Sequence, residues 1–413
     1  MQQNLRVDGD RLWSSLMRMA EIGATPKGGV NRQALTDEDK RGRDLFVEWC
    51  REAGCTIRID AVGNIFARRP GKKADLAPVQ TGSHLDSQPT GGRFDGVYGV
   101  LAGLEVLRTL NDREIETERP VELVVWTNEE GCRYAPAMMG SGVHVGKFPL
   151  PDVLAMVDLK GLGFGEELAR IGYAGTDKVD PADVAAFFEV HIEQGPILEA
   201  EKKTIGVVKG AQGQRWYDIA VTGQEAHAGP TPMKVRKDAL VGAARIVELV
   251  NRIGLENQPN ACATVGQLVV SPNSRNTIPG RVEFSVDFRH PDDAVLSKMK
   301  ATLESEAAGI CAAAGLELDL KEIWYQPPLA FDANCVAAVA AGAKANGFEA
   351  MEIISGAGHD ACNIASVAPT GMIFVPCENG ISHNEVENAE KPDIAAGCDV
   401  LLQAILDRAN AVA

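Results

Sequence analysis

The spacing of apolar residues along the chain predicts both helices and strands. Apolar residues at helical spacing, such as Val97, Leu101 and Leu104, predict helices over residues 1–20, 36–53, 96–110, 333–346 and 393–409. Short strand-like runs predict strands over residues 56–59, 64–67, 79–81, 121–127, 185–190, 204–208 and 371–375, and the apolar character of 121–127 predicts that this strand is buried. Strands that alternate with helices favour an α/β fold in which helices cover both faces of a sheet.

The middle of the chain, residues 211–327, has a different pattern of elements. Its predicted strands are 215–222, 263–270, 281–289 and 316–325, and its predicted helices are 233–252 and 292–313. This β-α-β-β-α-β order is the split ferredoxin-like α+β unit. We therefore expect a first domain made of residues 1–210 and 328–413, into which a second domain of residues 211–327 is inserted. The Pro327-Pro328 pair marks the return to the first domain.

Composition and charge exclude several classes of protein. The 413 residues carry a net charge of −16 and no local basic stripe, which argues against a nucleic-acid partner. No apolar stretch reaches the length of about 18 residues that a membrane span needs, and the first residues lack a signal-peptide pattern, so we expect a cytoplasmic protein. The nine cysteines form no CxxC pair, which argues against a disulfide framework or a cysteine-rich zinc site.

Histidine and carboxylate residues follow several of the predicted strands. They occur in four short segments: Gly82–Gly96, Asn128–Gly131, His191–Gly195 and Gly380–Glu385. Each segment alone is also compatible with a hydrogen-bonded loop or a solvated acidic turn. Together they offer nitrogen and oxygen ligands without cysteine, which suits zinc, manganese, cobalt or nickel. Five such ligands exceed one tetrahedral zinc site and suit two metal ions that share a carboxylate, for which we favour Asp95.

These segments carry a resemblance to a known enzyme family. The matching strings are Thr81–Ser87, Gly92–Gly96, Asn128–Gly131, His191–Gly195, Ala226–Gly229 and Ser382–Glu385. The set is similar to the M20-type co-catalytic metallohydrolases over nearly the whole chain. It most resembles the amidase branch, which contains N-carbamoyl-L-amino-acid amidohydrolases, fungal-type β-ureidopropionases and allantoate amidohydrolases. His191 stands where the peptidase branch usually carries an acid, which favours the amidase branch.

The resemblance implies a catalytic apparatus residue by residue. It implies that five residues hold two divalent metal ions, zinc by preference: His84, Asp95, Glu130, His191 and His383. Glu129 is implied as the general base, and His227 as the residue that binds the oxyanion. We expect the carboxylate of Asp86 to accept a hydrogen bond from His84 and so to orient its ring.

The substrate is expected to be a small ureido or amide carboxylate. The guanidinium of Arg289 can donate two parallel hydrogen bonds to the substrate carboxylate. Asn276, Gln194 and the backbone of Gly358 are expected to complete the pocket. Arg215 is a weaker candidate for the same role. His144 and His290 are expected to be structural.

The reaction implied is hydrolysis of an N-carbamoyl amino acid, either α-L or β, to the amino acid, CO2 and ammonia. Allantoate or ureidoglycolate amidohydrolase is an alternative, as is an N-acyl-amino-acid deacylase or aminopeptidase. A non-catalytic protein that kept the fold would have no need of Glu129. The resemblance also implies a mixed sheet flanked by helices, an inserted domain that acts as a lid, and a homodimer formed through that domain.

Overall fold

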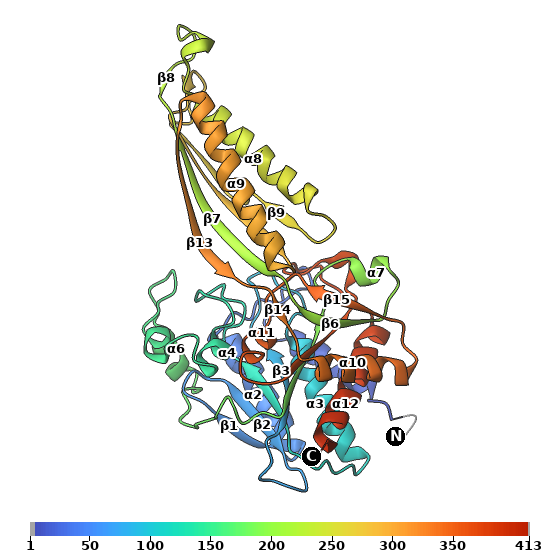
Figure 1. Ribbon diagram of the computed structural model, residues 1–413. Coiled ribbons are helices and arrows are strands. Elements are labelled where there is room, and N and C mark those ends of the chain that lie inside the picture. The colour runs from blue at the N-terminus through green and yellow to red at the C-terminus, as the bar shows by residue number, and fades with distance from the viewer. Residues whose placement is uncertain (1–4, 412–413) are drawn as a thin grey trace. The chain divides into compact units, whose positions relative to one another are not determined.

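The computed structural model describes residues 5–411 of the chain. The chain forms two compact units: unit 1 is Met1–Gly210 with Ala330–Ala413, and unit 2 is Ala211–Leu329 (Figure 1). None of the helices in the described range combines the length and the apolar character that a membrane span needs.

Unit 1 is built on a nine-stranded mixed sheet. Its strands are β1 (Thr56–Ile59), β2 (Ile65–Arg69), β3 (Val79–His84), β4 (Val121–Trp126), β5 (Ala186–Ile192), β6 (Ile205–Ala211), β14 (Leu329–Ala330), β15 (Ala350–Ser355) and β16 (Thr370–Val375). Their order is β1-β2-β4-β3-β5-β16-β6-β14, and β15 also pairs with β6. The four central strands, β4, β3, β5 and β16, run parallel, whereas β2 and β6 pair with them antiparallel. All four strands are buried throughout, and β4, β5 and β16 are accordingly mostly apolar, whereas β3 carries buried polar residues.

Helices cover both faces of this sheet. The longer ones are α1 (Gly9–Ala20), α2 (Asp37–Glu52), α3 (Val97–Asp112), α10 (Ala333–Asn346) and α12 (Lys391–Asn410), and the short ones are α4 (Met139–His144), α5 (Leu150–Leu154), α6 (Phe164–Arg170), α7 (Ile197–Ala200) and α11 (Asp360–Ile364). In β5, Val190 packs towards α12, whereas the neighbouring Glu189 accepts a hydrogen bond from α11. Because neighbouring side chains of a strand point to opposite faces, α12 and α11 lie on opposite sides of the sheet. The α/β fold with a mixed sheet flanked by helices is confirmed.

The first helix is shorter than the sequence pattern predicts. Residues 1–4 of the predicted segment lie outside the described residues. The helix begins at Gly9, because the Asp8 side chain accepts a hydrogen bond from the Arg11 backbone N–H and so caps the first turn.

The main sheet and the two long helices of unit 2 follow the predicted β-α-β-β-α-β order, and two short strands, β8 (Ala226–His227) and β11 (Thr277–Ile278), form a separate pair. The unit also contains β7 (Gly213–Thr222), η1 (Met233–Val235), α8 (Ala239–Glu256), β9 (Cys262–Thr264), β10 (Leu268–Ser271), β12 (Arg281–His290), α9 (Asp293–Ala314) and β13 (Glu317–Gln326). The antiparallel order β10-β12-β7-β13 is that of a ferredoxin-like sheet, with β9 also pairing with β12. Both helices pack on one face, where Val282, Phe284, Val286 and Phe288 of β12 are buried.

Two elements of unit 2 differ from their predicted extents. The strand predicted over residues 263–270 is two strands, β9 and β10, and Gly266 lies in the interruption. The helix predicted from Met233 begins at Ala239, because Asp238 caps it through the backbone N–H groups of Leu240 and Val241. Residues Met233–Val235 form a separate 3-10 turn after Pro232.

Candidate metal centre and active site

The parallel strands bring distant segments of the sequence to one edge of the unit 1 sheet. His84 is the last residue of β3, Glu129 follows the end of β4, and His191 lies near the end of β5. His383 follows β16 in the chain. Parallel strands have their carboxyl ends on the same side, which is where α/β sheets bind ligands. The fold therefore explains why residues about 300 positions apart can share one site.

Asp95 lies at the centre of two groups of potential metal ligands. Its Oδ1 is 3.3 Å from Nε2 of His191 and 3.6 Å from Nε2 of His84. Its Oδ2 is 3.5 Å from Nε2 of His383, which in turn is 3.3 Å from Oε2 of Glu130. The two groups, His84–Asp95–His191 and Asp95–Glu130–His383, thus share one carboxylate through its two different oxygens.

These distances fit ligands of a common cation better than direct hydrogen bonds. A charge-assisted N–H···O bond is about 2.7–2.9 Å long, shorter than the separations around Asp95. Two ligands bound at about 2.0–2.2 Å in tetrahedral geometry lie about 3.4 Å apart. The donor set of imidazole and carboxylate also suits a divalent transition metal. The residues therefore fit a metal centre.

The buried carboxyl groups have strongly perturbed acidity. Burial, together with the nearby charge of Asp95, raises the pKa of Glu130 to about 8. Burial also raises the pKa of Glu129 well above its usual value. Burial alone would raise the pKa of Asp95 as well, but the imidazoles of His191 and His84 hold it well below its usual range. Clustered carboxylates of this kind are costly unless a cation accompanies them.

Backbone carbonyls orient two of the histidines. Nδ1 of His84 lies 2.9 Å from the carbonyl oxygen of Asp86, and Nδ1 of His191 lies 2.9 Å from that of Ile192. Because a carbonyl can only accept, each Nδ1 carries the proton and each Nε2 keeps a free electron pair. Nε2 of His191 accepts the Gly96 N–H at 3.1 Å, which agrees with this tautomer, and a bound metal ion would take the place of that hydrogen bond. Both rings are thus presented as metal ligands.

Asp86 has a different role from the one expected. Its carboxylate lies 3.8 Å from His84, beyond hydrogen-bond distance, so the carbonyl rather than the carboxylate orients that ring. The two carboxylate oxygens instead accept the backbone N–H groups of Glu129 and Glu130, each at 3.2 Å. Asp86 therefore holds the loop that carries both glutamates.

Glu129 lies beside the first group of ligands. Its Oε2 is 3.5 Å from Nε2 of His84, and its side chain is 11% exposed. The turn that presents it begins at Asn128, whose φ of 56° lies in the left-handed region that asparagine tolerates. A carboxylate that is held next to a metal position and is not itself needed as a ligand can accept a proton from an attacking water.

Of the remaining predicted residues of unit 1, Gln194 contacts the ligand cluster directly. Nε2 of Gln194 donates to Oδ2 of Asp95 at 2.8 Å, and its Oε1 is buried with no partner among the described residues. Gly358 lies in the loop before α11, where an added Cβ would approach Cε of Met138 at 3.0 Å. His144 packs against Trp126 and Phe66 as a structural residue.

The predicted substrate-binding residues of unit 2 fall into two places. His227 in β8 pairs with Thr277 in β11, and the Asn276 carbonyl accepts the Ala228 N–H, so His227 and Asn276 are neighbours. Arg289 lies near the end of β12, where it pairs with Asp287 at 2.8 Å. Arg215 is nearly buried and pairs with Glu322 at 2.7 Å.

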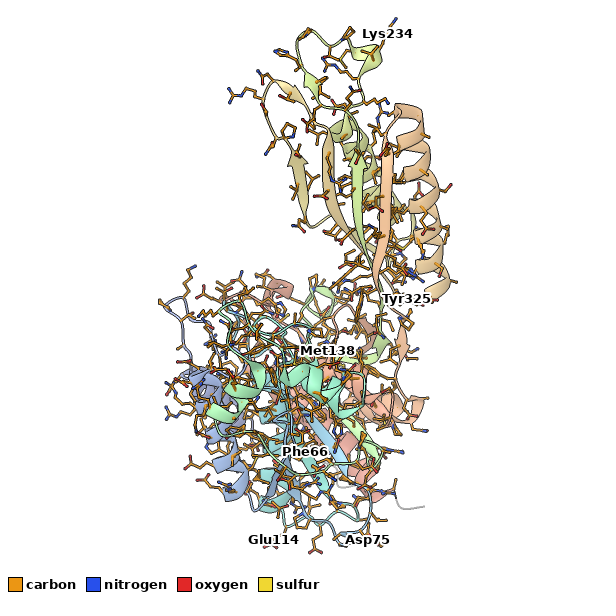
Figure 2. All side chains as sticks on the ribbon, turned by 90° about the vertical axis from the view of Figure 1, so that its left-hand side faces the viewer. Phe66, Asp75, Glu114, Met138, Lys234 and Tyr325 are labelled. Atoms are coloured by element: carbon orange, nitrogen blue, oxygen red, sulfur yellow. The ribbon has the colours of Figure 1, made fainter. Side chains whose placement is uncertain are left out.

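The two places lie at opposite ends of unit 2. Figure 2 shows Lys234, in η1 after β8, and Tyr325, in β13 opposite Arg215, at the two ends of this unit. At a rise of about 3.3 Å per residue, Arg281 and Arg289 are roughly 25 Å apart along β12. Because β11 directly precedes Arg281, His227 lies at the end that is remote from Arg289.

Three residues that the sequence analysis did not single out contact the metal ligands. Oε1 of Glu387 accepts the backbone N–H groups of Phe94 and Asp95, at 2.9 and 3.2 Å. Ser382 lies 2.6 Å from Asp95 Oδ2 and 3.0 Å from Glu387 Oε2, so Glu387 joins the Asp95 loop to the His383 loop. Gln88 contacts Glu130. The one feature of the sequence that could have pointed to these three residues is that each lies close in the chain to Asp86 or His383.

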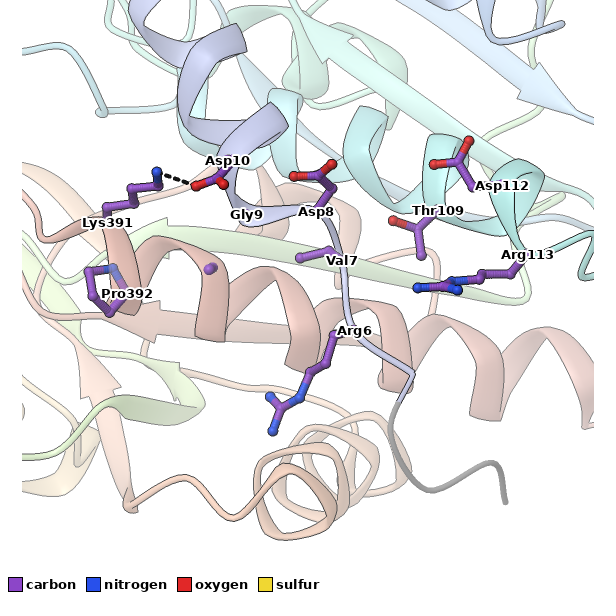
Figure 3. Close-up of a pocket in the computed structure, with 11 residues that line it drawn as sticks. Arg6, Val7, Asp8, Gly9, Asp10, Thr109, Asp112, Arg113, Lys391 and Pro392 are labelled. Carbon is purple, nitrogen blue, oxygen red and sulfur yellow. Dashed lines mark hydrogen bonds and ion pairs between the residues drawn. The ribbon is translucent and has the colours of Figure 1, made fainter.

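A cavity elsewhere on unit 1 shares no residue with this cluster. It has a volume of about 620 Å³ and lies between the start of α1 and the start of α12 (Figure 3). Its Lys391 pairs with Asp10, and its Arg6 pairs with Asp399. The cavity therefore contains none of the candidate metal ligands.

Comparisons with known proteins show the family to which this chain belongs. The model of peptidase family M20/M25/M40 matches residues 81–407. An N-carbamoyl-L-amino-acid amidohydrolase of Rhizobium meliloti is 51% identical over 99% of both chains, and an allantoate amidohydrolase of Bacillus subtilis is 34% identical over 93% of both. A crystal structure of an amidase of the hydantoinase/carbamoylase family from Burkholderia multivorans is 63% identical, with a TM-score of 0.95 over 99% of this chain and 100% of that one. The chain therefore belongs to peptidase family M20/M25/M40, whose members are metal-dependent.

Proposed function

We propose that this protein hydrolyses the ureido group of N-carbamoyl amino acids. The observation that carries the proposal is the pair of ligand groups that share Asp95, with Glu129 beside them. The names of the similar proteins support the substrate class, since the Rhizobium meliloti relative is named for N-carbamoyl-L-amino acids. In the reaction, one water and the ureido compound give the free amino acid and carbamic acid, which decomposes to CO2 and ammonia.

Two divalent ions, zinc by preference, would be held by His84, Asp95, Glu130, His191 and His383. When bound, such ions polarise a carbonyl oxygen and lower the pKa of a nearby water. Glu129 takes a proton from the attacking water and later delivers it to the departing nitrogen. The ureido carbonyl is a poor electrophile, so a positioned base and a polarised carbonyl are both needed.

Unit 2 supplies the residues that recognise the substrate. Arg289 binds the carboxylate, and His227 with Asn276 binds the oxygen that becomes negative during attack. Unit 2 would then act as a lid that excludes water when substrate is bound. Gln194 and Gly358 complete the pocket on unit 1.

The separation within unit 2 supports a homodimer with shared active sites. A carbamoyl amino acid is far shorter than the roughly 25 Å between Arg281 and Arg289 along β12. One copy of unit 2 therefore cannot place both His227 and Arg289 on one substrate molecule. We propose that Arg289 serves the site of its own chain and that His227 serves the site of a second copy. The edge strand β10, with Leu268 and Val269 exposed, is available for pairing between copies.

Replacing Arg289 by alanine should raise KM about 10- to 100-fold with little change in kcat. The reason is that the change removes a charge-assisted hydrogen bond to the substrate carboxylate, which acts equally in the ground and transition states. The measurement is steady-state kinetics with an N-carbamoyl-L-amino acid. Arg281→Ala is a matched control, because Arg281 lies on the same strand and also pairs with an acid two residues away. Equal effects of the two substitutions would remove Arg289 from the pocket.

An ammonia-release assay tests the proposed reaction. The metal-reconstituted protein should release ammonia from N-carbamoyl-L-amino acids or from N-carbamoyl-β-alanine. Turnover of allantoate at a higher kcat/KM would instead favour the alternative suggested by the Bacillus subtilis relative. Turnover of N-acyl amino acids, detected as free amino acid without ammonia, would show a deacylase and contradict the proposal.

A further inference from the structure

The two groups of ligands around Asp95 are not equally enclosed. His84, Asp95 and His191 are all buried. In the second group the side chain of His383 is 53% exposed, while that of Glu130 is 3% exposed. A cation held by the second group therefore depends strongly on how firmly Glu130 is fixed.

Gln88 holds both carboxylate oxygens of Glu130. Its backbone N–H donates to Oε1 at 3.1 Å, and its side-chain Nε2 donates to Oε2 at 2.8 Å. A carboxylate bound through both oxygens by one residue cannot rotate about its Cγ–Cδ bond without breaking a hydrogen bond. Each ionised oxygen has two lone pairs, so Oε2 can still face His383 and a shared cation.

The geometry points to Gln88 as a positioning residue that fixes Glu130 as a ligand of the second, more exposed cation position. This inference rests on the proposed two-ion function. The Gln88 side chain is half-buried, and across residues 5–411 the bond to Glu130 is the one hydrogen bond found for its amide. The amide therefore binds the candidate ligand and does not stabilise the surrounding loop. That loop is held by backbone hydrogen bonds, such as the one from the Gly91 N–H to the Gln88 carbonyl.

The test uses Gln88→Met, which keeps the length of the side chain and removes the amide. Metal-free protein is titrated with Co²⁺, and binding is followed by visible absorption and by calorimetry. Wild-type protein should bind two equivalents. The variant should bind the first equivalent with unchanged affinity and the second about 10- to 100-fold more weakly, as removal of a partner behind a ligand typically does. Activity at saturating Co²⁺ should largely recover, because Gln88 acts through Glu130 and not on the substrate.

Gln33→Met is the matched control, since Gln33 is also half-buried and its amide bonds to Asn31 away from the metal ligands. It should bind both equivalents like the wild type. Gln88→Ala is a second variant, expected to weaken the same step if Gln88→Met does not fold. Unchanged second-step affinity in the Gln88 variants, or equal weakening of both steps, would overturn the inference. Wild-type protein that binds fewer than two equivalents would contradict the proposed two-ion function itself.

Discussion

Replacing Glu129 by glutamine should lower kcat by about 10³-fold while cation binding stays near that of the wild type. Glutamine keeps the shape of the side chain but cannot accept the proton of the attacking water. The backbone N–H of Glu129, which donates to Asp86, is unaffected by the change. The measurement combines steady-state ammonia release with metal analysis of the purified variant.

Glu130→Gln is the matched control for this experiment, because it makes the same chemical change at the adjacent position. Glu130 faces His383 at 3.3 Å as a proposed ligand, so this variant should lose affinity for a cation as well as activity. If Glu129→Gln turned over at the wild-type rate, the base would have to be assigned to another group. If Glu129→Gln lost cation and Glu130→Gln did not, the two roles would be exchanged.

A hybrid dimer should regain activity from two inactive chains. One chain carries Glu129→Gln and the other carries His227→Ala, and the hybrid is purified through two different tags. In the shared-site arrangement, the chain with intact Glu129 receives His227 from its partner, so one of the two sites is complete. The hybrid should therefore show about half of the wild-type turnover, whereas each homodimer variant is nearly inactive.

The reciprocal hybrid distinguishes the arrangements. It carries both substitutions on one chain and pairs that chain with a wild-type chain. If His227 acts on the site of the partner, neither site is complete and the hybrid is inactive. If His227 acts within its own chain, the result reverses, and this hybrid shows half of the wild-type activity. A monomeric mass by light scattering would contradict the shared site without any assay of activity.

Much of the fold follows from local patterns that the sequence carries. The apolar run Val121–Thr127 predicted β4, and the alternating residues of β12 predicted a strand with one buried face. Elements whose bounds depend on capping or on partner strands were predicted less well. The start of α8 at Ala239 and the division of residues 263–270 into β9 and β10 are examples.

In the candidate site, too, residue types could be predicted from the sequence, whereas contacts between distant residues could not. Histidine and carboxylate residues at strand ends were recognisable, because their types and spacing suit nitrogen and oxygen coordination. The hydrogen bonds that hold them were not recognisable. Asp86 was expected to hold His84 with its carboxylate, yet it binds the backbone of Glu129 and Glu130. Nothing in the local sequence of Gln88 shows that its amide reaches Glu130.

Sequence alone predicted the α/β class, an inserted unit and the residue types of a candidate metal centre, since these depend on local periodicity and on chemistry that belongs to each side chain. Three-dimensional packing decided which oxygen of Asp95 faces which histidines, which donors hold Glu130, and how far His227 lies from Arg289. Those properties depend on distances between segments that are far apart in the chain. Such distances arise from the pairing of strands and the packing of helices, which no short stretch of sequence encodes.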